Sequence, residues 1–164
     1  MTKKFEASVT KDSLVFSAAH FITFNGNVCE RLHGHNWRVD LKASGQLDEN
    51  GYVFDFIALR DHCMALVQRL DHKVLLPEFH PLIKVTPSPD GKEVTSTFED
   101  RRWVFPSEDC EIMPLANTTA ELIADWFGRE LIASLKLDEV PTVQILTVSV
   151  EENFGQWATV ELNV

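Results

Sequence analysis

The strongest constraint on this chain is a strand pattern that begins at a pair of histidines. Between residues 35 and 47 apolar side chains occupy every second position, which predicts a half-buried strand. If the strand starts slightly earlier, His33 and His35 point to the same face, because strand side chains alternate. Two neighbouring imidazoles are suitable ligands for a divalent metal, and His20 closes another apolar stretch and offers a third. A His-x-His pair can also be an accident of surface composition, so both interpretations stand at this point.

Cys29 lies just ahead of the histidine pair, and whether it binds the metal decides between two kinds of zinc site. A tetrahedral zinc site with three histidine ligands keeps one position open for water or substrate, as catalytic sites do. A thiolate ligand from Cys29 would instead close the site as Cys-His-His-His, which is typical of structural zinc proteins. The residue types alone leave the catalytic and the structural alternatives open.

The composition is that of one acidic globular domain. The chain has 164 residues, of which 45% are hydrophobic and 24% charged, and its formal net charge is −10, so we expect a single domain over residues 1–164. The negative charge argues against nucleic acid as the main partner. No apolar run approaches the roughly 18 residues of a membrane span, and the first residues lack a signal peptide's apolar segment. Three cysteines without a disulfide-like pattern favour the cytoplasm.

Two amphipathic helices are predicted. Asp55 is a candidate N-cap, and apolar residues at helical spacing follow it over residues 56–70. Thr118 and Glu121 form a capping-box pattern, and a second stripe of apolar residues follows over about 119–135. Each helix therefore has one face suited to packing against a sheet.

The remaining pattern predicts strands on both sides of this helix pair. Four strands are expected, two before the first helix and two after the second: residues 5–18, 35–47, 143–150 and 157–162. Six of the seven prolines lie between Pro77 and Pro114, which excludes a long helix there. Only two short strands are expected in that segment, at 93–98 and 101–105. The prediction is an α+β fold of order ββααββ, with a proline-rich insert at 77–116 outside the sheet.

Two charged stretches have two interpretations each. Asp71 and His72 follow the end of the first helix. In the structural interpretation, the helix dipole favours the histidine and the aspartate is solvated. In the functional interpretation, the two side chains form a pair that takes part in chemistry. Arg101-Arg102-Trp103 holds the only adjacent arginines of the chain. This stretch is either a solvated face or part of an anion-binding rim.

Five short motifs occur in order along the chain. They are Phe16-Ser17-Ala18-Ala19-His20, Cys29-x-x-x-His33-Gly34-His35, Leu70-Asp71-His72, Thr118-Thr119-Ala120-Glu121 and Val150-Glu151-Glu152. With these motifs the chain resembles the 6-pyruvoyltetrahydropterin synthase and 6-carboxytetrahydropterin synthase family. The resemblance covers most of the chain apart from the insert, which shorter members lack. One motif alone would be a weak signal, whereas five in order are specific.

The resemblance implies roles for the matched residues. His20, His33 and His35 correspond to the three zinc ligands of the family. The substrate of such an enzyme is 7,8-dihydroneopterin triphosphate, and zinc would act on its side-chain oxygens as a Lewis acid. The resemblance therefore favours the open, catalytic alternative for the metal site.

Proton transfer would fall to three further residues. Cys29 corresponds to the catalytic cysteine, and a nearby cation would lower its pKa so that it acts as a base. Asp71 and His72 correspond to the acid–histidine pair that works with it, with Asp71 orienting His72. The resemblance thus gives the charged pair at the helix end a function.

The pterin ring would be bound by a glutamate. Glu152 matches the family residue that binds the amino and ring nitrogens, while Glu151 is one residue out of register, so strand alternation decides between them. Thr118 and Thr119 correspond more loosely to residues that line the pterin pocket. Glu152, Thr118 and Thr119 are the expected substrate-binding residues.

The fold implied by the resemblance is the tunnelling fold, or T-fold. Each subunit of that fold has four antiparallel strands with two helices on one face, which agrees with the predicted order. Subunits join their sheets into a ring, usually two stacked trimers, and active sites form between subunits. A closed ring also removes the two open edges of a four-stranded sheet. We therefore expect a homohexamer.

The product depends on the residues ahead of His33. A cysteine separated by three residues from His-Gly-His resembles the 6-carboxytetrahydropterin type of 7-deazaguanine and queuosine synthesis, whereas the pyruvoyl type usually has a longer gap. A third subgroup has a glutamate separated by two residues and releases 6-hydroxymethyldihydropterin for folate synthesis. Cys29 and Glu30 satisfy both patterns. Glu30 is thus either a second catalytic base or a surface residue.

Overall fold

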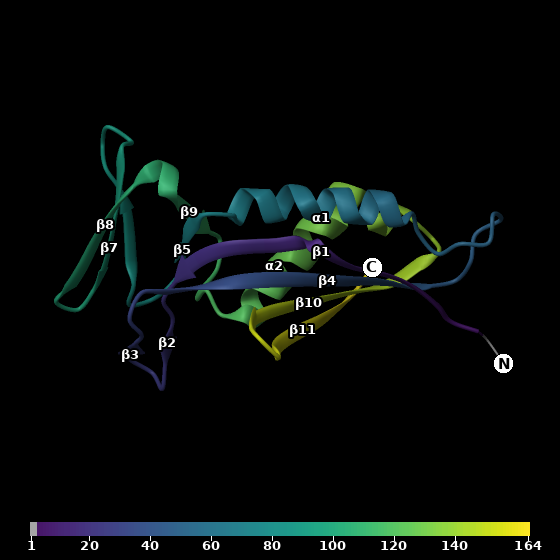
Figure 1. The fold of residues 1–164 in the computed structure, drawn as a ribbon, viewed down its shortest axis with the longest axis horizontal. Coiled ribbons are helices and arrows are strands. Elements are labelled where there is room, and N and C mark those ends of the chain that lie inside the picture. The colour runs from purple at the N-terminus through teal and green to yellow at the C-terminus, as the bar shows by residue number, and fades with distance from the viewer. Residues whose placement is uncertain (1–2) are drawn as a thin grey trace.

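The computed structural model describes residues 3–164 as an α+β fold built on one large sheet (Figure 1). Its long strands are β1 (Phe5–His20), β4 (His33–Gly45), β10 (Val143–Asn153) and β11 (Gln156–Asn163). They pair antiparallel in the order β11-β10-β4-β1. The four long strands expected from the sequence are present, with small differences in their bounds.

The large sheet has two strands more than expected. β5 (Lys73–Pro77) pairs in parallel with β1, and β9 (Cys110–Met113) pairs in parallel with β5. The sheet is therefore six-stranded and mixed, with the order β11-β10-β4-β1-β5-β9. The prediction of a four-stranded sheet with the insert wholly outside it was wrong. Runs of five and four residues beside prolines give too little period-two signal to be recognised.

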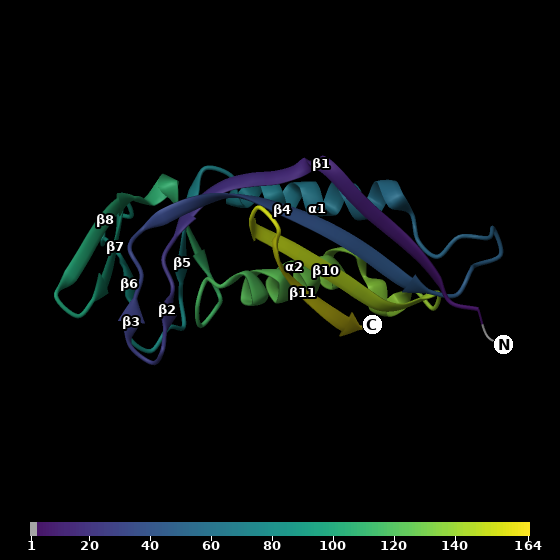
Figure 2. The same cartoon turned by 60° about the horizontal axis from the view of Figure 1, so that its bottom comes forward.

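Two helices cover one face of the large sheet (Figures 1 and 2). α1 (Phe56–Leu70) has the predicted bounds, and the Asp55 side chain caps its first turn. α2 (Ala120–Leu135) packs on β10 and β11 beside α1. The expected pair of helices on one face is thus present, and it buries one side of each long strand.

The cap of α2 differs from the predicted capping box. Thr119, and not Thr118, accepts a hydrogen bond from the N–H of Leu122, at 3.4 Å. Thr118 is instead fully buried ahead of the helix. The two adjacent threonines offer the same hydroxyl to the helix, so the sequence alone could not show which one enters the cap.

The main core lies between the large sheet and the helices. Phe16 of β1 stacks on Trp37 of β4 with ring centroids 5.8 Å apart, and Phe127 of α2 packs against Phe16. Because side chains alternate along a strand, His35 and His33 lie on the same side of β4 as Trp37. The histidine pair therefore continues the core-facing side of the strand, at its uncovered end.

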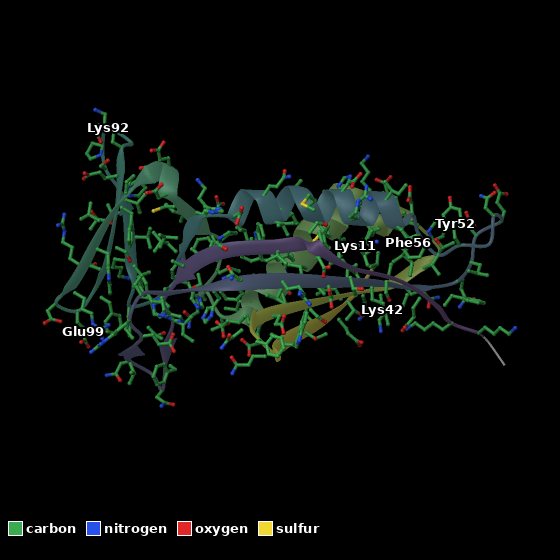
Figure 3. The ribbon with its side chains drawn as sticks, in the orientation of Figure 1. Lys11, Lys42, Tyr52, Phe56, Lys92 and Glu99 are labelled. Atoms are coloured by element: carbon green, nitrogen blue, oxygen red, sulfur yellow. The ribbon has the colours of Figure 1, made fainter. Side chains whose placement is uncertain are left out.

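The proline-rich insert forms a smaller sheet at one end of the molecule (Figure 1). β6 (Lys84–Pro87), β7 (Glu93–Phe98) and β8 (Arg101–Pro106) pair antiparallel in that order, which confirms the two short strands predicted there. Figure 3 places Lys92 and Glu99 at opposite ends of this sheet. Short 3-10 helices follow at Ser107–Asp109 and, after α2, at Leu137–Glu139.

A short hairpin, β2 (Thr23–Phe24) and β3 (Val28–Cys29), connects the long strands β1 and β4 and packs on the insert. Together they enclose a second apolar cluster, formed by Phe21, Cys29, Leu76, Ile83, Val94 and Phe98. We call these six residues the insert cluster. The insert is thus attached through its own core to the segment that joins His20 to His33.

At the other end of the molecule, the start of α1 is apolar and open. Tyr52 and Phe56, labelled in Figure 3, are 48% and 56% exposed. Across residues 3–164, the structure contains no helix that combines the length and apolar character required to cross a bilayer.

Candidate metal centre and active site

Three histidines from two paired strands converge at the end of the large sheet. His20 ends β1 and pairs directly with His33, the first residue of β4, while His35 pairs with Ala18 two positions along. One ring nitrogen of each histidine lies within 4.8 Å of the others. The sequence prediction that these three residues come together is borne out by this geometry.

The rings are oriented by backbone carbonyls. Nδ1 of His20 lies 2.8 Å from the carbonyl oxygen of Thr118, and Nδ1 of His33 lies 2.8 Å from that of Arg31. Each Nδ1–H donates to its carbonyl, so each Nε2 carries a lone pair. Burial lowers the pKa of His35, which favours the neutral form that binds metal.

The hydrogen bonding of His20 indicates whether a metal fits between the three histidines. Nε2 of His20 is fully buried and has no hydrogen-bond partner. Its nearest charged neighbour is Oε1 of Glu152, at 3.3 Å, which is also an acceptor. Two acceptors facing each other in a buried site are unfavourable unless a cation or a donor lies with them. The three histidines therefore fit a divalent metal, and the described group contains no cysteine, unlike the closed Cys-His-His-His alternative.

Strand alternation distinguishes the two glutamates at the end of β10. Glu152 faces the histidines, where its Oε1 lies 3.3 Å from Nε2 of His20. Glu151 points the other way, where it lies 4.0 Å from Arg38 and accepts a hydrogen bond from the N–H of Gly155. Glu152 is thus the glutamate placed to bind a ligand beside the histidines.

A cleft gives access to this carboxylate. Its volume is about 430 Å³, and it is lined by both Glu151 and Glu152 together with His35, Asn36, Arg38 and the exposed Phe154 among others. A metal-ligand candidate and a carboxylate thus share one opening, which is the arrangement expected of a small-molecule site.

Cys29 and Glu30 are adjacent in sequence but point to different surroundings. The Cys29 side chain belongs to the insert cluster and is 5% exposed. Burial raises the pKa of this thiol, and the charge of Arg101 offsets that only in part. Glu30 is about one-third exposed, with Oε2 3.9 Å from Nε2 of His33. In one subunit, therefore, Glu30 is the acidic group nearest the His33 edge of the site.

Comparison with known proteins agrees with this geometry. A family model described as 6-pyruvoyl tetrahydropterin synthase matches residues 8–163. The chain belongs to this family. Within it, a Methanocaldococcus jannaschii protein provisionally named 6-carboxy-5,6,7,8-tetrahydropterin synthase is 32% identical over 146 residues, which are 88% of each chain. An Aquifex aeolicus protein named 6-carboxy-5,6,7,8-tetrahydropterin synthase is 27% identical over 150 residues, 88% of this chain and 87% of its own.

Solved structures of the synthase family show the same fold. Two are variants of a Plasmodium vivax 6-pyruvoyltetrahydropterin synthase, each with a TM-score of 0.90 and 30% identity, covering 99% of this chain and 100% of the other. In these two variants a glutamate catalytic residue is replaced by alanine and by cysteine. The likeness spans the whole chain, so it includes the insert that the sequence patterns could not place.

The acid–histidine pair expected from the synthase resemblance is formed, and it shares a cleft with one residue of the histidine triad. Nδ1 of His72 lies 2.9 Å from Oδ2 of Asp71, and Oδ1 of Asp71 accepts a hydrogen bond from the N–H of Ser17 at 2.8 Å. That hydrogen bond lowers the pKa of Asp71. His72 is 83% exposed and lines a cleft of about 540 Å³ that is also lined by His35 of the triad. Within residues 3–164 no hydrogen bond or ion pair joins it to Cys29 or the triad.

The two threonines have structural contacts in this synthase subunit. Thr118 is fully buried, where its hydroxyl donates to the carbonyl of Phe21 at 3.4 Å and its own carbonyl orients His20. Thr119 caps α2. Neither side chain lines a cleft described above, so the expected contact of Thr118 and Thr119 with a pterin stays a prediction.

One residue near the synthase site was not assigned from the sequence. Arg101 donates from Nη1 to the carbonyl of Glu30 at 3.0 Å and from Nη2 to that of Cys29 at 2.9 Å. The adjacent arginine pair was the only available signal, and it could not reveal a partner about seventy residues earlier in the chain.

Proposed function

We propose that this chain is a zinc-dependent lyase that converts 7,8-dihydroneopterin triphosphate to 6-carboxy-5,6,7,8-tetrahydropterin. The observation that supports this most directly is the contact between the histidine triad and Glu152, whose Oε1 lies 3.3 Å from Nε2 of His20. A metal site and a carboxylate suited to a pterin ring thus share one cleft. The product is the one in the names of the M. jannaschii and A. aeolicus relatives.

Each residue of the site has a distinct task in this proposal. His20, His33 and His35 hold zinc through ring nitrogens, and zinc bound there supplies a Lewis acid for oxygens of the substrate side chain. Glu152 accepts hydrogen bonds from the amino and ring N–H groups of the pterin, and so directs the substrate side chain toward the triad. In this proposal Glu152 binds the pterin ring at one end of the cleft, and the reaction of the substrate side chain takes place at the histidines.

The proposed reaction balances without an oxidant. The product retains one of the three side-chain carbons of the substrate. The other two carbons leave as acetaldehyde, the phosphates leave as triphosphate, and one water is consumed. A base must take protons from the side chain, which we assign to Cys29, with His72 and Asp71 returning protons to the intermediate.

A second reaction is favoured by the position of Glu30. Its carboxylate lies beside His33 while Cys29 is buried in the insert cluster, and the P. vivax relative has a glutamate catalytic residue. A carboxylate there can take the proton of the hydroxyl on the second side-chain carbon of the substrate. The bond between the first and second side-chain carbons then breaks, and the electron pair of that bond enters the pterin ring. The products are 6-hydroxymethyl-7,8-dihydropterin and glycolaldehyde triphosphate, which together contain all atoms of the substrate.

We also propose that the complete site forms between subunits of a ring. His72 is exposed and lines a cleft with His35, but within residues 3–164 no described hydrogen bond or ion pair joins it to Cys29 or the triad, and a neighbouring subunit would complete this open cleft. The open edge of β11 and the apolar start of α1 are available for contact with other copies. A hexamer of two stacked trimers is the arrangement that the family resemblance implies.

Product analysis tests both reactions at once. The zinc-loaded protein is incubated with 7,8-dihydroneopterin triphosphate, and pterins, free triphosphate and glycolaldehyde triphosphate are identified by mass. Carboxy product should appear with equal amounts of triphosphate and acetaldehyde, and hydroxymethyl product with glycolaldehyde triphosphate. Cys29→Ala should remove the first pair and Glu30→Gln the second, each by roughly 10²-fold or more, the effect of losing a general base.

Two results would contradict the proposal. The absence of any pterin product from zinc-loaded wild-type protein would refute the activity. Unchanged product yields in Glu30→Gln would remove Glu30 from the chemistry and leave the carboxy reaction alone.

A further inference from the structure

Arg101 connects the insert to the two residues that could act as the base. It is the first residue of β8, and its two terminal nitrogens donate to the carbonyls of Glu30 and Cys29 at 3.0 Å and 2.9 Å. Hydrogen bonds from a charged donor are stronger than neutral ones, and a guanidinium offers two in a fixed geometry. One side chain thus fixes two successive peptide groups.

The same segment is held from its other side. The N–H of Glu30 donates to the carbonyl of Ile22 at 2.9 Å, across the base of the hairpin. With Arg101 on its carbonyl, Glu30 is therefore fixed at both ends of its backbone. Rotation of this residue would break at least one of these hydrogen bonds.

Aromatic contacts hold Arg101 itself in place. The guanidinium carbon lies 5.8 Å from the ring centre of Phe98, a member of the insert cluster. Two residues further along β8, Trp103 stacks on Phe21 with ring centroids 4.5 Å apart. β8 therefore packs on the residues that follow His20, and Arg101 cannot move away without disturbing this packing.

Fixing these carbonyls decides where the side chains point. With the backbone held in this register, the Cys29 side chain enters the insert cluster and the Glu30 carboxylate faces His33. We propose that Arg101 is a positioning residue that presents Glu30, and not Cys29, to the substrate, and so sets the ratio of hydroxymethyl to carboxy product. The expected effect of Arg101 on the product ratio rests on the proposed function. The expected effect of Arg101 on the accessibility of Cys29 rests on the contacts alone.

The product ratio is the first test. Arg101→Met removes both hydrogen bonds and keeps the apolar stem, so the ratio of hydroxymethyl to carboxy product should fall by roughly tenfold or more. The KM should change much less than this ratio, because Glu152 still binds the pterin. Arg102→Met is the matched control, since the neighbouring arginine is exposed and has no described side-chain contact. It should retain the wild-type ratio.

Alkylation of Cys29 tests the contact without any turnover. Iodoacetamide is added to the folded zinc-loaded protein, and the modified peptides are quantified by mass. Cys29 should react roughly tenfold faster in Arg101→Met than in wild type, because its segment opens more often. Cys63, fully buried in α1, is the internal reference and should remain unmodified. Arg101→Lys keeps the charge but loses the two-pronged geometry, and should give intermediate values.

The possible results separate the inference from the proposed function. Faster alkylation in Arg101→Met but not in Arg102→Met, with a lower product ratio, supports the inference. If wild type forms no pterin product while alkylation still accelerates, the backbone contact stands and the proposed function fails. The inference is overturned if Cys29 in a folded Arg101→Met is alkylated at the wild-type rate. It is also overturned if the product ratio is unchanged while turnover is intact. If Arg101→Met does not fold, wild-type values of both quantities in Arg101→Lys overturn it.

Discussion

The carboxylate of Glu152 faces Nε2 of His20 across 3.3 Å, although neither atom can donate a proton to the other. Nδ1 of His20 gives its proton to the carbonyl of Thr118, so Nε2 presents a lone pair. Two acceptors at this distance are stable together only when a cation or the donors of a ligand lie between or beside them. The same contact is therefore compatible with a cation at the triad and a hydrogen-bond donor from a ligand at Glu152.

Substitution of Glu152 should weaken substrate binding and leave the metal in place. Glu152→Gln keeps the shape of the side chain but replaces charge-assisted hydrogen bonds of about 1.5–3 kcal/mol by weaker ones, so kcat/KM should fall by roughly tenfold or more. Steady-state kinetics and zinc content measure the two effects. Glu151→Gln is the control, because Glu151 lies 4.0 Å from Arg38 and makes no described contact with the histidines. Equal losses in both variants would mean that strand alternation does not select Glu152.

Sequence reasoning reached the histidine triad because its determinants are local. Three histidines at strand positions and a period-two pattern are enough to put His33 and His35 on one face. The bounds of α1 followed from Asp55 and one apolar stripe in the same way. β5 and β9 were missed because each is short and is stabilised by its neighbour in the sheet, which no local pattern reports.

Subunit mixing tests whether the site is shared. His33→Ala should lose the metal site and His72→Ala the exposed acid–histidine pair, so each alone should be inactive. If one site takes its two halves from different subunits, mixed oligomers contain some sites with both halves intact. For random mixing in equal amounts this fraction is roughly a quarter, so about that share of wild-type activity should return. The measurement is turnover after co-refolding, with light scattering to confirm the oligomer. No recovery in verified mixed oligomers would place both halves in one subunit.

His80 should make stability depend on pH. It is buried, its Nδ1 accepts hydrogen bonds from the N–H groups of Leu82 and Ile83, and its Nε2–H donates to Thr23. Burial, helped by the charge of Lys84, lowers the pKa of His80, so the folded protein holds the neutral ring. As pH falls, His80 takes up a proton in the unfolded chain before it does so in the folded protein. The contribution of His80 to the free energy of unfolding is therefore complete above about pH 6.5 and is lost progressively as the pH falls below that value.

His80→Asn separates this effect from other acid-sensitive groups. The Asn oxygen can still accept from the two backbone N–H groups, but it does not titrate. Melting temperatures of the zinc-loaded proteins between pH 7.5 and pH 5 should therefore fall less steeply in His80→Asn than in wild type. Identical slopes for the two proteins would show that His80 is protonated equally in the folded and unfolded states.

The positions of Cys29 and Glu30 show where sequence reasoning ends. Both residues match family motifs, and a strand or a loop at this point would each be compatible with the sequence. What separates them is the packing of Cys29 in the insert cluster and the contact with Arg101, which lies about seventy residues further along the chain. A contact of that sequence separation depends on the insert's own fold, and the insert was the least predictable part of the chain.

The central claim is that the three histidines hold a catalytic zinc, and zinc titration tests it most directly. Protein stripped with a chelator is titrated with zinc while turnover of 7,8-dihydroneopterin triphosphate is followed by mass. We expect no turnover without metal, a linear rise to one zinc per subunit, and no recovery in His33→Ala. Full turnover by the stripped protein, or by His33→Ala without bound zinc, would contradict the account.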